Sequence, residues 1–446
     1  MSSSLLVAAA AAVLSASLTA FTPSPDASAG PRAESPSAEP SSASVQPRRD
    51  PSDPAAVKGY LSGLQRGAAK KQRECVASSR DGKTTRWCME PIDPAKAPEA
   101  PPPSKIKRAA ADPTPPALCA QKPGQTSYDR FHACYEGVGR LVNEETGVVG
   151  AIVRFDVWAT LSAKNPTWLM QAGVTATNVA PELVAAVPSF VASLACDAGH
   201  CELPAPVEKK IVPNTYTYYE LATQIPSSAP GDNIQYTNPQ VKLTLKTQNA
   251  WPGANVTNPL NDPFNIRCDK ETYIGGHGCV YYMGNAAAGT FYIDYAVADP
   301  KYGDYREVVK HNLYAIEVRD NLKHYGHISY GNPLHRADPI THENNRRSIC
   351  TQAIRDKASG LGLSCDEYPF ASSEEGGTQN PRYSCAFLLL DENSNHGNAL
   401  ENSLYKPNRI LPALNEGGTY IQGDPYWVWV LNRPSTVPTV KQCSQY

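Results

Sequence analysis

The chain has 446 residues, of which 19% are charged, and its formal net charge is −2. This near-neutral balance excludes the basic footprint of a high-affinity nucleic-acid binder, although an enzyme can still meet a nucleic acid briefly through a few local cations. The length allows one to three domains with a sizeable core.

The N-terminal residues predict a secretory signal peptide over residues 1–29. Leu5 to Ala20 carries no charge and is rich in Ala, Leu and Val, and Ala27-Ser28-Ala29 fits a small-x-small cleavage site. No Lys or Arg precedes the apolar core, and the alternative interpretation is an Ala-rich disordered tail. No later segment reaches the ~18 uninterrupted apolar residues that a membrane span needs, so no membrane anchor is expected.

Twelve cysteines are spread along the chain, and the first five neighbouring pairs are separated by 13, 15, 5, 11 and 15 residues. An even number of cysteines behind a signal peptide predicts disulfides and a secreted protein. We expect sequential pairing. No Cys-x-x-Cys occurs, so a structural zinc cluster is not expected.

Residues 30–117 are predicted to be largely disordered. Ser, Pro and Ala dominate 22–56, and a second Pro/Ala/Lys tract spans 91–117. Such segments bury too little apolar surface to offset the entropy of ordering. Residues 57–90, which include two cysteines, form a small segment between the tracts.

Residues 118–325 are predicted to form a β-rich, sandwich-like domain, whose role the sequence does not indicate. Segments rich in Val, Ile, Thr and Tyr, such as GVVGAIVRFDVWATL and PQVKLTLKTQ, are separated by turn signals such as PGDN. The apolar run over 180–196 is predicted to be one helix broken at Pro188.

Residues 330–446 change character and predict a small α+β domain. After a short helix that ends at glycine, PRYSCAFLLLDENSNHG predicts a strand that enters a polar loop. NALENSLYKPNRIL predicts a helix up to Pro407, and DPYWVWVLN predicts a final strand.

Four carboxylates lie within the stretch CDEYPFASSEEGG, with no basic residue between them: Asp366, Glu367, Glu374 and Glu375. A strand followed by an Asn-rich loop and a helix could bring a carboxylate near Asn393. Carboxylate and amide oxygens suit Mg²⁺ or Mn²⁺. The alternative interpretation is a solvated acidic turn.

These residues resemble the NucA/NucB-type secreted deoxyribonucleases of bacteria. Asp366 to Ala371 matches their Asp-Glu-aromatic-Pro-x-Ala segment, Glu375 to Gly377 matches their Glu-Gly-Gly, and Glu392-Asn393 matches their acid-Asn loop. The resemblance covers roughly residues 335–435. It implies a ββα-metal-like core and a secreted, metal-dependent, non-specific endodeoxyribonuclease that meets DNA transiently.

The resemblance also implies roles for individual residues. Asp366 would be the base or its support and a metal ligand, Glu367 an adjacent acid, Glu375 a residue that orients water or metal, and Asn393 a metal ligand. The ββα-metal group usually has a histidine base, and none lies within 361–377.

Several basic side chains are candidates for contact with substrate phosphates: Arg346, Arg347, Arg382, Arg409 and His396. His335 and His342 could line the cleft, although a structural role is the commoner one for such a histidine. Two alternative functions stay open, namely a secreted binding protein with an inactive nuclease-like fold and a toxin-like nuclease effector. Protein partners are not indicated.

Overall fold

The computed structural model describes residues 74–80, 83–186, 188–196, 201–224, 234–247, 254–257, 264–271, 274–282, 287–318, 325–378, 380–416 and 419–446. The predicted signal peptide and the predicted disordered residues before 74 lie outside the described residues. Within the described ranges, no helix is long and apolar enough to cross a membrane.

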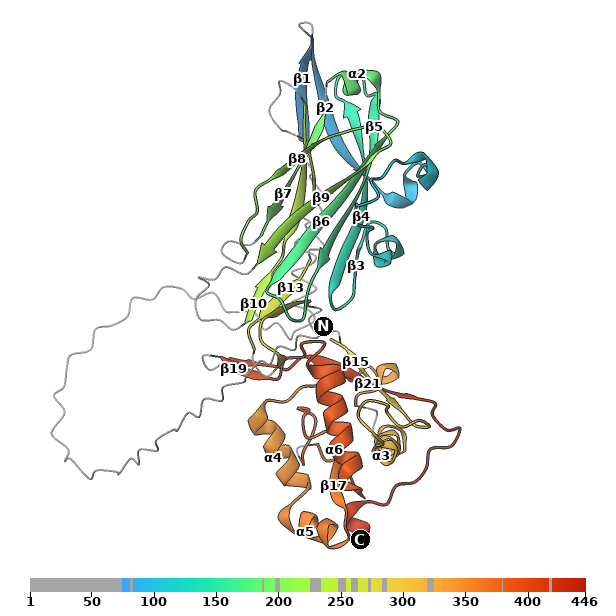
Figure 1. Cartoon of the computed structure of the whole chain (residues 1–446), viewed down its shortest axis with the longest axis vertical. Helices are drawn as coiled ribbons and strands as arrows, with labels where there is room; N and C mark the ends of the chain where they lie inside the picture. The colour runs from blue at the N-terminus through green and yellow to red at the C-terminus, as the bar shows by residue number, and fades with distance from the viewer. Residues whose placement is uncertain are drawn as a thin grey trace, which may run out of the picture. The chain divides into compact units, whose positions relative to one another are not determined.

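The β-rich region contains one large antiparallel sheet in the order β1-β2-β4-β5-β6-β9, with β3 paired to β4 (Figure 1). Its strands are β1 (Glu74–Arg80), β2 (Lys83–Ile92), β3 (Thr126–Tyr128), β4 (His132–Asn143), β5 (Val149–Thr160), β6 (Thr167–Thr177) and β9 (Tyr216–Gln224). Short 3-10 turns precede β3: η1 (Pro94–Lys96), η2 (Pro103–Lys105) and η3 (Ala117–Gln121).

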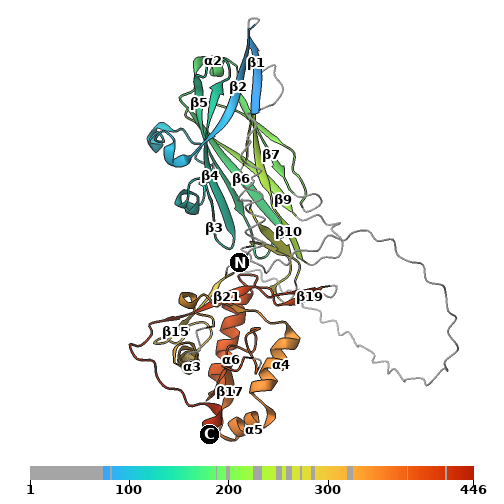
Figure 2. The same cartoon turned by 180° about the vertical axis from the view of Figure 1, so that it is seen from behind.

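Two smaller sheets complete the β-rich region, in the orders β12-β11-β7-β8 and β10-β13-β14 (Figure 2). Their strands are β7 (Ser189–Ala195), β8 (Val207–Lys210), β10 (Ile234–Thr237), β11 (Gln240–Lys246), β12 (Ala254–Thr257), β13 (Ile266–Asp269) and β14 (Gly278–Tyr281). Inward-facing side chains of all three sheets share one hydrophobic core, which includes Met170, Leu243 and Ile266. The predicted β-rich character is therefore confirmed.

The prediction of a helix over 180–196 is wrong beyond its first turn. Helix α2 covers only Pro181–Ala185, and β7 follows. Phe190, Ala192 and Leu194 alternate with more exposed residues and join the core, because β7 pairs with β8 on one side and β11 on the other. The period-2 pattern of this segment therefore outweighs its helix-favouring alanines.

Part of the region predicted to be largely disordered belongs to the large sheet. β1 and β2 form a hairpin, and β2 pairs with β4. Trp87 and Met89 of β2 lie in the core of the β-rich region.

The C-terminal region mixes helices with short strands. Its helices are α3 (Arg306–Glu317), η5 (Ile328–Tyr330), α4 (Pro339–Ile349), α5 (Gln352–Gly360), α6 (Leu390–Ala399), the π-helical η6 (Leu400–Tyr405) and η7 (Cys443–Gln445). Its strands are β15 (Thr290–Asp294), β16 (Leu334–His335), β17 (Ser364–Tyr368), β18 (Ser384–Leu388), β19 (Leu414–Glu416), β20 (Thr419–Ile421) and β21 (Pro425–Leu431).

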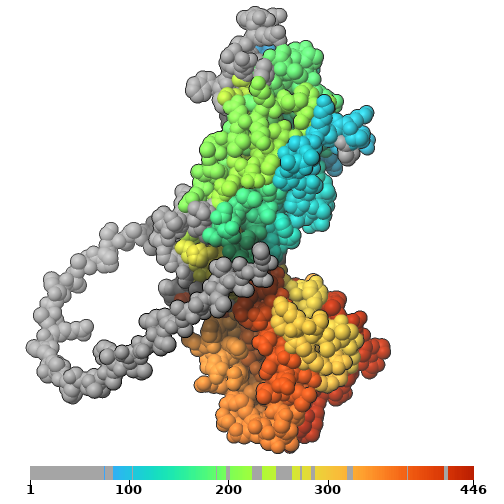
Figure 3. All heavy atoms as spheres, viewed as in Figure 1, coloured from blue at the N-terminus to red at the C-terminus, as the bar shows by residue number. Residues whose placement is uncertain are grey.

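The core of the C-terminal region begins earlier in the chain than the predicted boundary at 325–330. β15 lies parallel to β21, and Phe291 of β15 and Leu313 of α3 pack in the same core as Val428. Figure 3 shows this yellow segment packed against the orange and red segments that follow it. A strand pair so distant in sequence gives no local signal of the boundary.

The acidic stretch lies on a strand pair followed by a helix. β17 pairs antiparallel with β18, and α6 begins two residues after β18. The polar loop predicted after the strand is therefore helical. Asp391 and Glu392 lie in the first turn of α6, where acidic side chains stabilise the N-terminal end of the helix dipole.

Six disulfides confirm the predicted sequential pairing. They join Cys75–Cys88, Cys119–Cys134, Cys196–Cys201, Cys268–Cys279, Cys350–Cys365 and Cys385–Cys443. The last two lie side by side, with Cys365 Sγ and Cys385 Sγ 3.5 Å apart.

Candidate functional site

An open cleft of about 390 Å³ lies on the C-terminal region. It is lined by Tyr325, Glu374, Glu375, Asn380, Pro381 and Arg382. Of the residues predicted to be catalytic, Glu375 lines this cleft.

Glu375 forms a close pair with His335. The backbone N–H of His335 donates to Glu375 Oε2 at 2.9 Å, and His335 Nδ1 lies 2.6 Å from Glu375 Oε1. In a neutral imidazole, contact with a carboxylate favours the tautomer whose proton is on Nδ1, and Nε2 is then an acceptor. Nε2 has no hydrogen-bond partner among the described residues. Both side chains are about one-sixth exposed or less, at 17% and 13%.

The local backbone holds this pair in register. His335 lies in β16, which pairs antiparallel with β21, and the backbone N–H of Glu374 donates to the carbonyl of His335 at 2.8 Å. The two segments that carry the histidine and the carboxylate are therefore hydrogen-bonded to each other directly, which fixes the geometry of the pair.

Glu374 is held on the other side of the same turn. Its Oε1 accepts from the backbone N–H of Gly423 at 2.7 Å, and its Oε2 accepts from Gln422 Nε2 at 3.2 Å. Burial raises the pKa of Glu374, and these hydrogen bonds oppose the shift. The turn thus presents two adjacent carboxylates, each with defined partners.

The glycine pair after Glu375 makes room for α4. Asn345 of α4 donates from Nδ2 to the carbonyls of Ala371 and Ser373, at 3.1 and 2.8 Å. A Cβ on Gly376 or Gly377 would collide with Asn345 or with backbone of the turn, and Gly377 has φ of +80°. The two glycines of Glu-Gly-Gly therefore allow a tight turn to pack directly against a helix.

Asp366 lies elsewhere, inside the core. It is 6% exposed, and its Oδ2 lies 2.5 Å from His311 Nδ1. His311 Nε2 lies 2.9 Å from Ser384 Oγ, and both residues have no exposed surface. The order of contacts is that of a Ser-His-Asp triad, but a substrate cannot reach it, so its evident effect is to join α3 to the β17–β18 hairpin.

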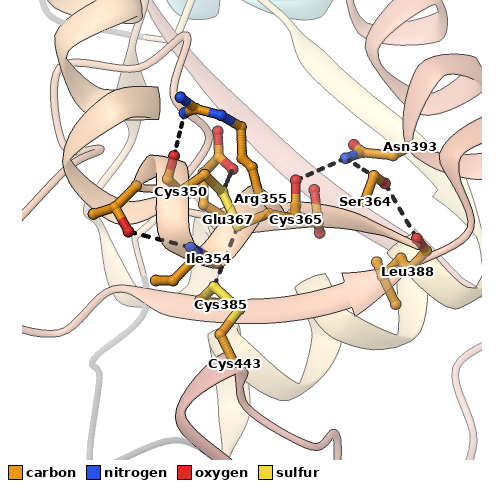
Figure 4. Close-up of a disulfide and its surroundings, with 12 residues drawn as sticks. Cys350, Ile354, Arg355, Ser364, Cys365, Glu367, Cys385, Leu388, Asn393 and Cys443 are labelled. Carbon is orange, nitrogen blue, oxygen red and sulfur yellow. Dashed lines mark hydrogen bonds between the residues drawn. A yellow bond between two sulfur atoms is a disulfide. The ribbon is translucent and has the colours of Figure 1, made fainter. Parts of the chain in front are cut away.

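Glu367 points to the opposite face of β17, where it contacts a disulfide (Figure 4). Its Oε2 lies 3.1 Å from Cys350 Sγ. A disulfide sulfur carries no proton, so any hydrogen bond here must be donated by a protonated Glu367. Burial raises the pKa of Glu367 to about 8, which favours that protonated form.

Asn393 of α6 also supports the hairpin. Its Nδ2 donates to Ser364 Oγ at 3.3 Å and to the carbonyl of Cys365 at 3.1 Å (Figure 4). In the part of the chain that the structure describes, no three ligand atoms of His, Asp or Glu side chains converge as a ready metal cage. The predicted pairing of Asp366 and Asn393 on one ion stays a prediction.

The predicted phosphate contacts fall into two groups. Arg346 and Arg347 are exposed on α4 beside Glu343, and Arg382 is exposed at the cleft. The structure does not fit a phosphate contact for Arg409 or His396, because both side chains are buried.

Arg409 has no exposed surface and pairs with Asp269. His396 is 4% exposed, and its ring packs against Phe291, Tyr305 and Phe370. Burial lowers the pKa of His396 to about 4, so it carries no charge at neutral pH.

Sequence reasoning did not identify His335 as the partner of Glu375. The two are 40 residues apart, and they meet because β16 and the acidic turn are hydrogen-bonded. Two features of the sequence could have pointed to His335. No histidine lies within 361–377, so a histidine base would have to come from elsewhere, and His335 begins the segment HRADPITH just before a helix cap.

Residues 328–415 match the model of the deoxyribonuclease NucA/NucB family. No curated protein and no solved structure gives a significant match. The cleft residues Glu374, Glu375 and Arg382, and His335 beside them, all lie inside the matched segment. The match identifies a nuclease domain in the C-terminal region and implies DNA as its substrate.

Proposed function

We propose that the C-terminal region is an exported, metal-dependent, non-specific endodeoxyribonuclease, and that its reaction takes place in the cleft beside His335 and Glu375. The family match supports hydrolysis of DNA. The observation that carries the proposal is the His335–Glu375 pair at 2.6 Å beside an open cleft.

His335 has the geometry of a general base. With Nδ1 bonded to Glu375, Nε2 can accept a proton from the water that attacks the phosphorus. The carboxylate then stabilises the imidazolium that forms and keeps the ring in one orientation. Glu375 would thus support the base, in addition to the role of orienting water or metal that the resemblance implies for it.

The residues of the cleft fit a Mg²⁺ or Mn²⁺ ion. Magnesium sites in such enzymes use one or two carboxylates, with water and substrate phosphate completing the shell. Glu374 and Glu375 are adjacent carboxylates that both line the cleft, and they would hold the ion. A bound divalent cation would supply positive charge opposite the charge that develops on the phosphate.

The remaining features fit a substrate recognised by its backbone. Arg382 is exposed at the cleft and can contact a phosphate, and such contacts carry no sequence information. The antiparallel β17–β18 pair followed by α6 supports the proposal of a ββα-metal-like core. Six disulfides suit an oxidising, extracellular location.

The proposal is tested with the purified full chain on supercoiled and linear DNA, with Mg²⁺, with Mn²⁺ and with EDTA. We expect both substrates to be cut, with no cleavage in EDTA. His335→Ala should lower kcat by about 100-fold or more, since general-base catalysis is typically worth 10²–10⁴ in rate.

His132→Ala is the matched control. His132 forms the same kind of pair, with Nδ1 3.0 Å from Asp129 Oδ1, but it lies in the β-rich region. Its variant should cut DNA at the wild-type rate. Wild-type cleavage by folded His335→Ala, or uncut DNA under every metal condition, would contradict the proposal.

A further inference from the structure

We infer that Arg130 and Arg267 of the β-rich region are positioning residues for the cleft carboxylate Glu374, on which they act through Asp424. The inference rests on the proposed nuclease function and gives the β-rich region a role in it.

The two arginines hold Asp424 inside a buried ionic cluster. Arg267 Nη1 lies 2.6 and 2.7 Å from the two oxygens of Asp424, and Arg130 Nη2 lies 3.1 Å from Oδ2. The side chain of Arg267 is only 1% exposed, that of Arg130 is 8% exposed and that of Asp424 is 7% exposed. Charge pairs withdrawn from water this far resist separation, because a single partner left behind would be an uncompensated buried charge.

Asp424 also fixes the backbone around it. Its Oδ2 accepts from the backbone N–H of Leu411 at 3.0 Å, and its own backbone N–H donates to the carbonyl of Leu411 at 2.9 Å. Its carbonyl accepts from the backbone N–H of Arg336 at 3.2 Å. The backbone and side chain of Asp424, the residue before β21, are therefore both fixed by hydrogen bonds.

The neighbours of Asp424 reach the cleft. Gly423 donates its backbone N–H to Glu374 Oε1 at 2.7 Å, and Gln422 contacts the other oxygen. A Cβ on Gly423 would collide with the carbonyl of Arg336, so this segment has no room to shift without moving its neighbours. Arg336 follows His335, so Asp424 is hydrogen-bonded to the residue beside His335 and is also adjacent in sequence to Gly423, which contacts Glu374.

Arg409 provides a contrast within the same cluster. Its side chain runs from the C-terminal region to Asp269 of β13 and to the carbonyls of Ala163 and Gly276. It forms no hydrogen bond with Asp424 or Glu374 side chains in the described residues. The backbone carbonyl of Arg409 accepts from Arg130 Nη2 at 3.0 Å and from Arg267 Nη2 at 2.6 Å, and a substitution of the side chain keeps this carbonyl. The Arg409 side chain thus joins the two regions without contacting Gln422, Gly423 or Asp424 among the described residues.

The inference predicts a specific kinetic effect of Arg267→Met in the full chain. We expect kcat on DNA to fall by about 10-fold to 100-fold, as a displacement near 1 Å can cause, with KM within about twofold. KM should hold because Arg382 and the other exposed cations are unchanged. Arg267→Lys should restore part of kcat, since it returns the charge.

A second measurement does not depend on activity. Hydrogen exchange of the peptide that contains Gly423 should become faster in Arg267→Met. In Arg409→Met, both kcat and exchange of this peptide should match the wild type, even where the melting temperature falls. Asp424→Asn, which keeps the size of the side chain, replaces Arg267→Met if that variant does not fold.

The outcomes separate the two proposals. Unchanged kcat and unchanged exchange in folded Arg267→Met, or equal losses in Arg409→Met, would overturn the positioning role. A wild-type chain that cuts no DNA would overturn the proposed function, while the exchange measurement would still decide whether the arginines hold the cleft segment.

Discussion

Two histidine–carboxylate pairs of similar geometry occur among the described residues of the C-terminal region, and they differ in burial. His311 and Asp366 are 2.5 Å apart in the core, whereas His335 and Glu375 are 2.6 Å apart beside the cleft. A general base must exchange protons with water, so the second pair is the one suited to catalysis. The first pair satisfies buried polar atoms and holds elements together.

Glu367 gives a prediction at the scale of a residue. Its pKa is raised to about 8 by burial, so between about pH 4.5 and 8 the folded state keeps a proton that the unfolded state loses. The contribution of Glu367 to the free energy of unfolding therefore falls as pH rises through that range. Glu367→Gln removes the effect, and we expect its gain in stability over wild type to be at least about 1 kcal/mol larger at pH 8 than at pH 5.

Thermal melts at the two pH values measure this difference. Glu343→Gln is the control, because Glu343 is ion-paired and exposed on α4 and its pKa is lowered. That variant should show no larger gain at pH 8 than at pH 5. An equal effect of Glu367→Gln at both pH values would contradict the prediction, and loss of cleavage by a stable Glu367→Gln would favour the catalytic role predicted from sequence.

The residue types of the candidate site could be predicted from sequence, but the location of each residue in the fold could not. Glu375 lines the cleft, whereas Asp366 and Glu367 point to opposite faces of β17 and into packed surroundings. Side chains alternate along a strand, so Asp366 and Glu367, which are neighbours on β17, cannot share one site. Only the fold brings His335 to Glu375.

At the scale of elements, α4 shapes the acidic turn. Asp338 caps the helix by accepting from the backbone N–H groups of Ile340 and Thr341, and Asn345 then reaches the carbonyls of the turn. The turn is therefore built against a helix whose start is fixed, and the glycines are the residues that allow the approach.

Gly377→Ala tests this packing. It adds a Cβ at φ of +80° and into the Asn345 side chain, whereas Gly362→Ala adds one at φ of +70° with nothing within 4 Å. The backbone alone costs about 1–2 kcal/mol. We expect Gly362→Ala to lose that much stability, measured by denaturant unfolding, and Gly377→Ala to lose more and to lower kcat on DNA. Equal losses would mean that α4 does not press on the turn.

Element types were predictable where the local pattern was clear, as in β21 and in the helix that ends before Pro407. They were not where partners decided the outcome. The alanine-rich segment that contains β7 reads as a helix until its two neighbouring strands are known. The parallel pairing of β15 with β21 joins residues more than a hundred apart, so no local signal places the start of the C-terminal core.

At the scale of the whole molecule, covalent links and buried charges supplement the hydrophobic cores. The disulfides occur in both regions, and the one nearest the C-terminus closes by far the longest loop, with a sequence separation of 58 residues. Gln442 beside it accepts from Ser384 Oγ at 3.0 Å and from the backbone N–H of Cys385 at 3.2 Å. The tail after β21 is thus tied to β18, next to the acidic hairpin.

Loop length predicts how much each disulfide contributes to stability. Closing a loop lowers the entropy of the unfolded chain, by about 4 kcal/mol for a separation of 58 residues and about 2 kcal/mol for one of 5. Replacing Cys385 and Cys443 by alanine should therefore cost about twice as much free energy of unfolding as replacing Cys196 and Cys201. Urea unfolding followed by pulse proteolysis measures both losses and assigns each to its region. If the short loop cost as much as the long one, native packing around the disulfides, and not the unfolded chain, would determine their contribution.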